Sequence, residues 1–529
     1  VGGWIGYRLR KASFDALVIY GASENPIYIL AEDGKIEIQE APELWGKGSQ
    51  ETDGILTERY GEESSVASIG IAGEKLVNYA CVNVDWNRKK YRHGQAGRTG
   101  TGAVMGSKSL KAIVAIGTEE VSVADSDRLR EVSRKAMKQA VESSAYDMWR
   151  RQGTMSVIEW ANEIEALPTH NFQKTSFTYA KKIGGETMEK KFKTRSRPCS
   201  NCTIPCEHVA KAKYPDIGEI EIGVEYETAA MLGSNLGLMR FPEIIKANWM
   251  CDDLGIDTIT AGSVMAFVTE CIQRRLLSKT RVGLLPKFGD AKGVYRMIEM
   301  IARREGFGDK MAQGVKALSE EIGKGSEHFA MQVKGLEISA YDQRAAPAMG
   351  LSYGTCDIGA HHNRSWAITY DIKVGRSSYG EDKAEQVIYL QHLRPMFDML
   401  GVCRFYWVEL NLDPNLYAQA YSAVTGKEFT LQDLLLRAEK VWNLTRVIAV
   451  LRQHIDMKDD MLPEREFTDA IRTGKTKRSK LDKAKFKEML ETYYRKRGWD
   501  GEGTPTKDKL LELGLPEAAE RLYPLTPLA

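Results

Sequence analysis

The chain has 529 residues, of which 43% are hydrophobic and 28% are charged, and its 74 basic and 72 acidic side chains leave a net charge of +2. This composition is typical of a globular protein with ample core, and the length indicates two to four domains. The even charge balance gives no basis for a nucleic-acid surface, and no apolar run approaches the roughly 20 residues that a membrane-spanning helix needs. We therefore expect neither nucleic acid nor membrane as a partner.

The first part of the chain, up to about residue 120, reads as β-rich. Residues 16–20, 26–30 and 110–116 are short apolar runs with β-branched members, which predict strands. Asp33-Gly34 follows the second run and predicts a hairpin turn. The chain starts at Val1 without a signal-peptide pattern, so we expect a piece of a longer protein that lacks its natural start.

Helical periodicity dominates after residue 126. Leu129, Val132, Ala136, Ala140 and Val141 fall roughly on one helical face. Residues 242–254 predict a helix with proline in its first turn and glycine at its end, and residues 434–455 predict another long helix. The basic segment 189–197 is expected to be exposed.

Four of the eight cysteines can form one site. Cys199, Cys202 and Cys206 stand in C-x-x-C-x-x-x-C, and Cys403 lies far downstream. Three thiolates within eight residues plus a remote fourth suit a [4Fe–4S] cluster, while a structural zinc site with four cysteines is the main alternative. The remaining cysteines stand singly, as buried thiols do, and the whole pattern fits a reducing cytoplasm.

Two similar acidic loops accompany this cluster. Residues 252–257 and 398–403 both read D-x-x-G-(Ile/Val)-x, and the second copy has Cys403 where the first has Asp257. Each loop follows a helical pattern, so its glycine is expected to cap the helix while the next amides turn outward toward a ligand. A carboxylate pairs well with a planar edge that offers two N–H donors, such as a pterin. Two ordinary helix ends with exposed aspartates are the alternative.

Five segments spread over the whole chain resemble one family, the tungsten-containing aldehyde:ferredoxin oxidoreductases. They are residues 71–77 (IAGEKLV), 96–108 (AGRTGTGAVMGSK), 225–228 (EYET), 340–344 (AYDQR) and 493–499 (YYRKRGW). The resemblance implies an α+β fold, in which a β-rich pterin-seating domain is followed by two mostly helical domains. The corresponding boundaries here are 1–122, 123–331 and 332–529, and the first domain is expected to be incomplete.

The resemblance also implies two cofactors, a tungsten (or molybdenum) bis-pterin and one [4Fe–4S] cluster. The cluster ligands carried over are Cys199, Cys202, Cys206 and Cys403. The residues implied to contact the pterins are Arg98, Gly100, Asp252, Gly255, Ile256, Asp257, Arg364, Asp398, Gly401 and Val402.

Two catalytic residues carry over by the same resemblance. Glu227 is similar to the family's active-site carboxylate, and it precedes an apolar run that makes a solvated role less favourable. His362 is similar to the histidine beside the metal, with His361 one residue away in register. Cys356, a few residues earlier, is interpreted as an inert thiol or as a pocket residue near the metal.

The implied reaction is oxidation of an aldehyde to its carboxylic acid, with ferredoxin as the electron acceptor in the cytoplasm. A multi-subunit enzyme that reduces a carboxylate or an aromatic acid with the same cofactor is the alternative, and a zinc-stabilised binding protein is a third. Lys246 and Trp249 stand where some members carry Glu-x-x-His, so a metal-bridged dimer is not supported. A homodimer of another kind and iron–sulfur partner subunits remain open.

Overall fold

A mixed six-stranded sheet forms from the first part of the chain. The computed structural model describes residues 2–86 and 92–524. Within them the strand order of this sheet is β2-β1-β6-β3-β4-β5, with β1 and β6 parallel and the other neighbours antiparallel. The strands are β1 (Ile27–Glu32), β2 (Lys35–Glu40), β3 (Ser65–Ile69), β4 (Val82–Val84), β5 (Gly94–Ala96) and β6 (Leu110–Ile116).

Helices cover both faces of the central strands. On one face Val66 and Val114 pack against Leu56 of α2 (Ser49–Tyr60). On the other face the cluster formed by β3 and β4 receives Ile5 of α1 (Ile5–Lys11) and Met105 of α4 (Thr101–Gly106). Because both faces are covered, every residue of β3 is buried, and β6 reads as a nearly continuous apolar run, as buried strands do.

The strand predictions are confirmed at two of three places. β1 and β6 match the runs at 26–30 and 110–116, and Asp33 (φ 39°) and Gly34 (φ 82°) form the tight turn between β1 and β2. The prediction for 16–20 is wrong. No strand forms there, and Val18 and Tyr20 are 73% and 89% exposed. An apolar run without a neighbouring strand has nothing to pair with.

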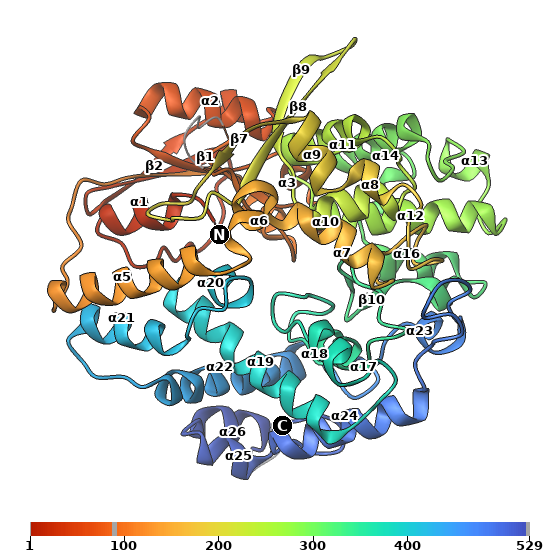
Figure 1. Cartoon of the computed structure of the whole chain (residues 1–529). Helices are drawn as coiled ribbons and strands as arrows, with labels where there is room; N and C mark the ends of the chain where they lie inside the picture. The colour runs from red at the N-terminus through yellow and green to blue at the C-terminus, as the bar shows by residue number, and fades with distance from the viewer. Residues whose placement is uncertain (1, 87–91, 525–529) are drawn as a thin grey trace. The chain divides into compact units, whose positions relative to one another are not determined.

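The described residues divide into two compact units (Figure 1). The first comprises residues 1–122 and 145–331, and it also holds a three-stranded sheet in the order β7-β8-β9. The strands of this sheet are β7 (Lys193–Arg197), β8 (Glu207–Tyr214) and β9 (Gly218–Gly223). The further helices of this unit are α3 (Ile71–Glu74), α6 (Tyr146–Gln152), α7 (Val157–Glu163), α8 (Ala180–Ile183), α9 (Gly185–Lys191), α10 (Tyr226–Ala229), α11 (Phe241–Leu254), α12 (Thr258–Gln273), α13 (Lys279–Val282), α14 (Ala291–Arg303), α15 (Gly308–Met311) and α16 (Val315–Ile322).

The second unit comprises residues 123–144 and 332–529 and is mostly helical. Leu393, Met396 and Phe397 of its long helix α19 pack against Leu434 and Ala438 of α22. Its helices are α5 (Ser126–Glu142), α17 (Pro347–Gly354), α18 (Ile368–Val374), α19 (Glu381–Leu400), α20 (Phe405–Val408), α21 (Asn415–Thr425), α22 (Leu431–Gln453), α23 (Glu464–Thr468), α24 (Lys483–Arg497), α25 (Lys507–Glu512) and α26 (Pro516–Leu522), with the short hairpin β10 (Gln332–Val333) and β11 (Leu336–Glu337).

The helix predictions are confirmed, with one difference in the buried face of α5. α11 and α22 match the helices expected at 242–254 and 434–455, and α5 begins at Ser126. In α5, Val132 and Ala140 are buried but Val141 is 48% exposed, so the buried face is narrower than predicted.

The expected α+β class, a sheet region first and mostly helical regions after it, is confirmed. The three-domain division stays a prediction. No helix among the described residues is long and apolar enough to cross a membrane.

Candidate active site

A β-hairpin presents the three clustered cysteines. β7 ends at Arg197 and β8 begins at Glu207, and these two residues are direct partners in the strand register. Their side chains form a buried ion pair, with Arg197 Nε 2.7 Å from Glu207 Oε2 and Nη2 2.6 Å from Oε1. The pair therefore closes the base of the loop that holds the cysteines.

The expectation that residues 189–197 form an exposed segment is wrong at its end. Residues 189–191 belong to α9, residues 193–197 form β7, and Arg197 is 5% exposed. The prediction used only the charge of the segment. It did not anticipate that Arg197 has a buried acidic partner ten residues further on.

Each clustered sulfur accepts an N–H group. Gly3 N lies 3.2 Å from Cys199 Sγ, Ile204 N lies 3.3 Å from Cys202 Sγ, and Arg92 Nη1 lies 3.0 Å from Cys206 Sγ. In the second unit Phe405 N lies 3.4 Å from Cys403 Sγ. N–H donors directed at sulfur stabilise thiolates, the form that binds metal.

Arg92, which no sequence motif marks, links the cysteine loop to a second candidate segment. Its Nη2 lies 2.8 Å from Glu225 Oε1, and Thr154 Oγ1 donates to the other Glu225 oxygen. Thr154 in turn accepts from Tyr226 N at 3.0 Å. The polar chain therefore runs from Cys206 to the first turn of α10, where Glu227 stands.

Glu227 lies half-buried on α10, ahead of the buried π-helical turn Ala230–Ser234. The next residue, Thr228, has its hydroxyl 2.8 Å from that of Thr258 at the start of α12. The first unit thus brings the catalytic candidate next to the end of the first D-x-x-G loop.

The first D-x-x-G loop ends α11, and its backbone amides donate to carbonyl groups of the protein. Gly255 takes the left-handed conformation (φ 77°) as predicted. Gly255 N donates to Asp252 O and Ile256 N to Cys251 O, while Asp257 N donates to Tyr79 O. The expectation of amides turned outward to a ligand is wrong for these three, because they satisfy the end of α11 and a neighbouring segment.

Asp252 and Asp257 of this loop differ in what they contact. Asp257 caps α12 by accepting from Ile259 N and Thr260 N, and its Oδ2 lies 3.1 Å from Arg98 Nε in a buried ion pair. Asp252 is 4% exposed, and burial, followed by the charge of Glu207, raises the pKa of its carboxyl well above its usual range. Asp252 is therefore the carboxyl of this loop that a ligand with N–H donors would stabilise most.

Gly100, and Gly255 of the first D-x-x-G loop, pack tightly against backbone atoms of neighbouring segments. Gly100 has φ 77°, and a Cβ there would lie 2.2 Å from Asn78 O. A Cβ on Gly255 would lie 2.7 Å from Gly70 N. Packing alone accounts for both glycines, whatever else they contact.

The second D-x-x-G loop lies in the second unit and repeats the turn. Gly401 has φ 66°, with Gly401 N donating to Asp398 O and Val402 N to Phe397 O. The Asp398 side chain is 67% exposed and pairs with Arg364, whose Nε lies 3.2 Å from Asp357 Oδ1. Arg364 therefore holds the loop against the segment that follows Cys356.

His362 lies beside an aromatic side chain of the same unit. Its ring is 6.1 Å from that of Tyr341, in an edge-on arrangement. His361 Nδ1 instead accepts from Asn363 N at 3.0 Å, a local turn contact. The choice of His362 over His361 stays a prediction.

The sequence also missed Arg394, a buried residue of α19. Its Nη1 lies 3.5 Å from the carbonyl oxygens of His362 and Asn363. Burial, followed by the charge of Arg404, lowers the pKa of Arg394 to about 9. An arginine at a buried position of a predicted helix is the one signal that could have found it.

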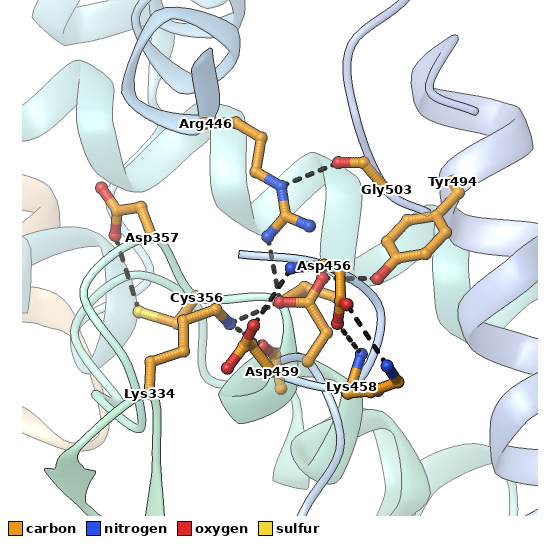
Figure 2. Close-up of polar contacts among 12 residues, drawn as sticks. Lys334, Cys356, Asp357, Arg446, Asp456, Lys458, Asp459, Tyr494 and Gly503 are labelled. Atoms are coloured by element: carbon orange, nitrogen blue, oxygen red, sulfur yellow. Dashed lines mark hydrogen bonds and ion pairs between the residues drawn. The ribbon is translucent and has the colours of Figure 1, made fainter. Parts of the chain in front are cut away.

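Cys356 sits beside a buried ionic network (Figure 2). Asp460 Oδ1 lies 2.5 Å from Lys334 Nζ and 3.0 Å from Arg446 Nη1, and Tyr494 donates to the other oxygen. Lys334 also donates to Gly354 O and so fixes the end of α17. Burial, followed by the charge of Asp357, raises the pKa of Cys356 to about 12, which favours the inert-thiol interpretation.

The candidates divide between the two units. The first contains Cys199, Cys202, Cys206, Glu227 and the first loop with Arg98 and Gly100, and the second contains Cys403, His362, Arg364 and the second loop. Among the described residues, no three His, Cys, Asp or Glu side chains converge closely enough to hold a single metal ion. The ligand and catalytic assignments stay predictions.

Family models match almost the whole chain. The model for the N-terminal domain of aldehyde ferredoxin oxidoreductase covers residues 1–117, and that for its domains 2 and 3 covers residues 131–515. The chain belongs to the aldehyde ferredoxin oxidoreductase family. It is therefore an oxidoreductase, and the predicted resemblance is confirmed.

Known proteins are similar to this chain to different degrees. The tungsten-containing aldehyde ferredoxin oxidoreductase of Pyrococcus furiosus is 37% identical over 98% of this chain and 84% of its own length. The aliphatic sulfonate oxidoreductase WOR-like subunit of the same organism is 26% identical over 97% of this chain and 82% of its own. Among solved structures, the active-site complex BamBC of benzoyl coenzyme A reductase matches with a TM-score of 0.81 and 22% identity, over 98% of this chain and 84% of that chain, which shows a shared fold.

Proposed function

We propose that this family member oxidises an aldehyde to its carboxylic acid, with a tungsten bis-pterin and one [4Fe–4S] cluster as cofactors and ferredoxin as acceptor. The observation that carries the proposal is the set of three N–H-bonded sulfurs joined through Arg92 and Glu225 to the segment of Glu227. The 37% identity to tungsten-containing relatives supports tungsten and the aldehyde reaction.

The sulfur sites fit a cluster. Cys199, Cys202 and Cys206 would supply three ligands, and Cys403 is the proposed fourth. Each of these sulfurs accepts an N–H group, a pattern that favours the anionic form required of a ligand.

The loops fit a pterin in part. Asp252 is the buried carboxyl whose ionised form would gain from two N–H donors on a planar ligand. Arg364 and Asp398 would act in the second loop, where their ion pair is exposed enough to rearrange. Asp257 and Arg98 already neutralise one another, so their contribution is to hold the first loop in place.

The chain's own residues would handle protons and orientation. A tungsten bis-pterin held there would supply the two-electron oxidation and Lewis-acid polarisation of an oxygen atom. Glu227 would accept a proton from the attacking water, and a protonated His362 would donate a hydrogen bond to the carbonyl oxygen of the aldehyde. A half-buried carboxylate on α10 is suited to the first role, because a positioned carboxylate can serve as a general base.

Reduction of a carboxylate or an aromatic acid is the second candidate. The fold shared with the benzoyl coenzyme A reductase complex supports it, although that similarity is at 22% identity. An enzyme of this kind depends on partner subunits that feed electrons, whereas the proposed enzyme passes electrons to ferredoxin directly. Purification with or without iron–sulfur partners separates the two.

The test is metal analysis of the anaerobically purified full-length enzyme together with an aldehyde assay. We expect about four irons and one tungsten per chain, with aldehyde-dependent reduction of a viologen dye. Glu227→Gln should keep the metals and lower kcat by about 10²–10⁴-fold, the usual contribution of a general base. Glu219→Gln, an exposed glutamate of β9, is the matched control and should retain activity.

Either half of the proposal can fail by itself. Zinc without tungsten or labile sulfide would reject the cofactor assignment and favour a zinc-clasped protein. Full activity in Glu227→Gln with intact metals would reject Glu227 as the base.

A further inference from the structure

Arg92 differs from the other donors that contact the candidate ligand sulfurs. Cys199, Cys202 and Cys403 each accept from a backbone N–H, whereas Cys206 accepts from a guanidinium at 3.0 Å. Of these four donors, only the Arg92 guanidinium carries a full positive charge.

Arg92 is held firmly where it stands. Its backbone N donates to Pro198 O at 3.1 Å, next to the first cysteine, so its main chain is hydrogen-bonded to the cysteine loop. Its side chain is 18% exposed and is fixed at the other end by Glu225 at 2.8 Å. An arginine guanidinium stays protonated in proteins. The guanidinium is therefore a permanent charge at the sulfur.

Such a charge acts on electron transfer as well as on binding. Hydrogen bonds to the sulfurs and the local net charge set the reduction potential of an iron–sulfur cluster. A positive donor on a thiolate ligand stabilises the more negative, reduced form, and the effect is large where the site is partly shielded from water. Glu225 opposes it, because its own negative charge lies against the same guanidinium.

We propose that Arg92 raises the reduction potential of the cluster bound at Cys206 and that Glu225 sets how far. This inference rests on the proposed function, since it requires the cluster. It assigns Glu225 a positioning role distinct from that of Glu227, two residues away. It also makes opposite predictions for the two partners of one ion pair, which a purely structural role would not.

The test is an EPR-monitored redox titration of the holoenzyme and three variants. Arg92→Gln should lower the midpoint potential, so that the ratio of reduced to oxidised cluster at the wild-type midpoint falls about tenfold, a shift of about 59 mV for one electron. Glu225→Gln should shift the midpoint upward. Arg92→Lys keeps the charge without the two-pronged contact, and its midpoint should lie between those of wild type and Arg92→Gln.

Arg195→Gln is the matched control. Arg195 lies on the same hairpin, in β7, and pairs with Glu221 at a side-chain exposure of 38%. It removes the same charge from a solvated position without a sulfur contact, so its midpoint should equal that of wild type.

The outcomes separate the two levels of argument. A wild-type enzyme without a cluster would reject the proposed function. A cluster of unchanged potential in Arg92→Gln and Glu225→Gln would reject this inference and leave the function standing. If Arg92→Gln fails to assemble a cluster, the midpoint potentials of Arg92→Lys and Glu225→Gln test the inference. We expect them to shift in opposite directions, and shifts of the same sign would overturn the inference.

Discussion

The two D-x-x-G loops share one turn and have different surroundings. In both, a glycine with positive φ ends a helix, and the amide of that glycine and the amide of the next residue donate to carbonyls at the same relative positions of the helix. In the first loop Asp252 is buried and Asp257 caps the next helix while pairing with Arg98. In the second, Asp398 is exposed and Cys403 stands where Asp257 would be.

This difference shows what the motif encodes. The glycine specifies how the helix ends, and this depends on neighbouring residues only. Whether the carboxylate is buried, paired or free to meet a ligand depends on segments far away in sequence. The same six-residue pattern therefore builds a rigid support in one unit and an accessible metal-ligand candidate in the other.

The largest expected effect concerns Cys403, the residue by which the second loop departs from the first. Cys403→Ala should remove most of the bound iron from about four atoms per chain, because a cubane needs four protein ligands. Iron and labile sulfide assays measure this. Cys356→Ala, which replaces a buried thiol outside the proposed ligand set, should keep its iron, and a full complement in Cys403→Ala would contradict the ligand assignment.

A second comparison tests whether the two acidic loops differ in stability. Asp257→Ala leaves Arg98 buried without its partner and should cost about 3–5 kcal/mol in the free energy of unfolding. Asp398→Ala breaks an exposed pair and should cost about 1 kcal/mol or less. Urea denaturation of the two variants gives the difference, and equal costs would show that the burial contrast is wrong.

The two glycines offer a matched backbone test. Gly401→Ala has open space around its Cβ and should cost only the left-handed strain of about 1–2 kcal/mol. Gly255→Ala has the same strain, and its Cβ would also overlap Gly70 N, adding about 1–3 kcal/mol. Thermal unfolding should therefore rank Gly255→Ala as the less stable variant, and the reverse order would contradict the packing described here.

The smallest effect is a pH dependence at Asp252. Its raised pKa means that the folded chain holds this proton more tightly than the unfolded chain, so the associated stability is present at low pH and is lost as pH rises above the unfolded pKa of about 4. Asp252→Asn cannot lose that proton. The drop in unfolding free energy between pH 5 and pH 8 should therefore be smaller in Asp252→Asn than in wild type, and an unchanged drop would contradict the burial of this carboxyl.

Much of the fold was predictable where local chemistry decides it. The strands at 27–32 and 110–116, the Asp33-Gly34 turn and the end of α11 all follow from short patterns. The run at 16–20 was not predictable as a loop, because its composition is that of a strand. What it lacks is a neighbouring strand to pair with. The basic stretch before Cys199 failed for a related reason, since its last arginine finds a buried acid in the strand register.

The sequence by itself determined the family, the α+β class, the cysteine spacing and the way both D-x-x-G helices end, because each depends on residues close together in the chain or on motifs read directly from it. Only the tertiary structure placed Arg92 against Cys206, 114 residues away, and Arg98 against Asp257, 159 residues away. Contacts of that separation depend on how whole elements pack, and burial then fixes the strength of each charge. The cysteine and D-x-x-G motifs can be read from residues close together in the chain, whereas the ion pairs and hydrogen bonds around them depend on the tertiary structure.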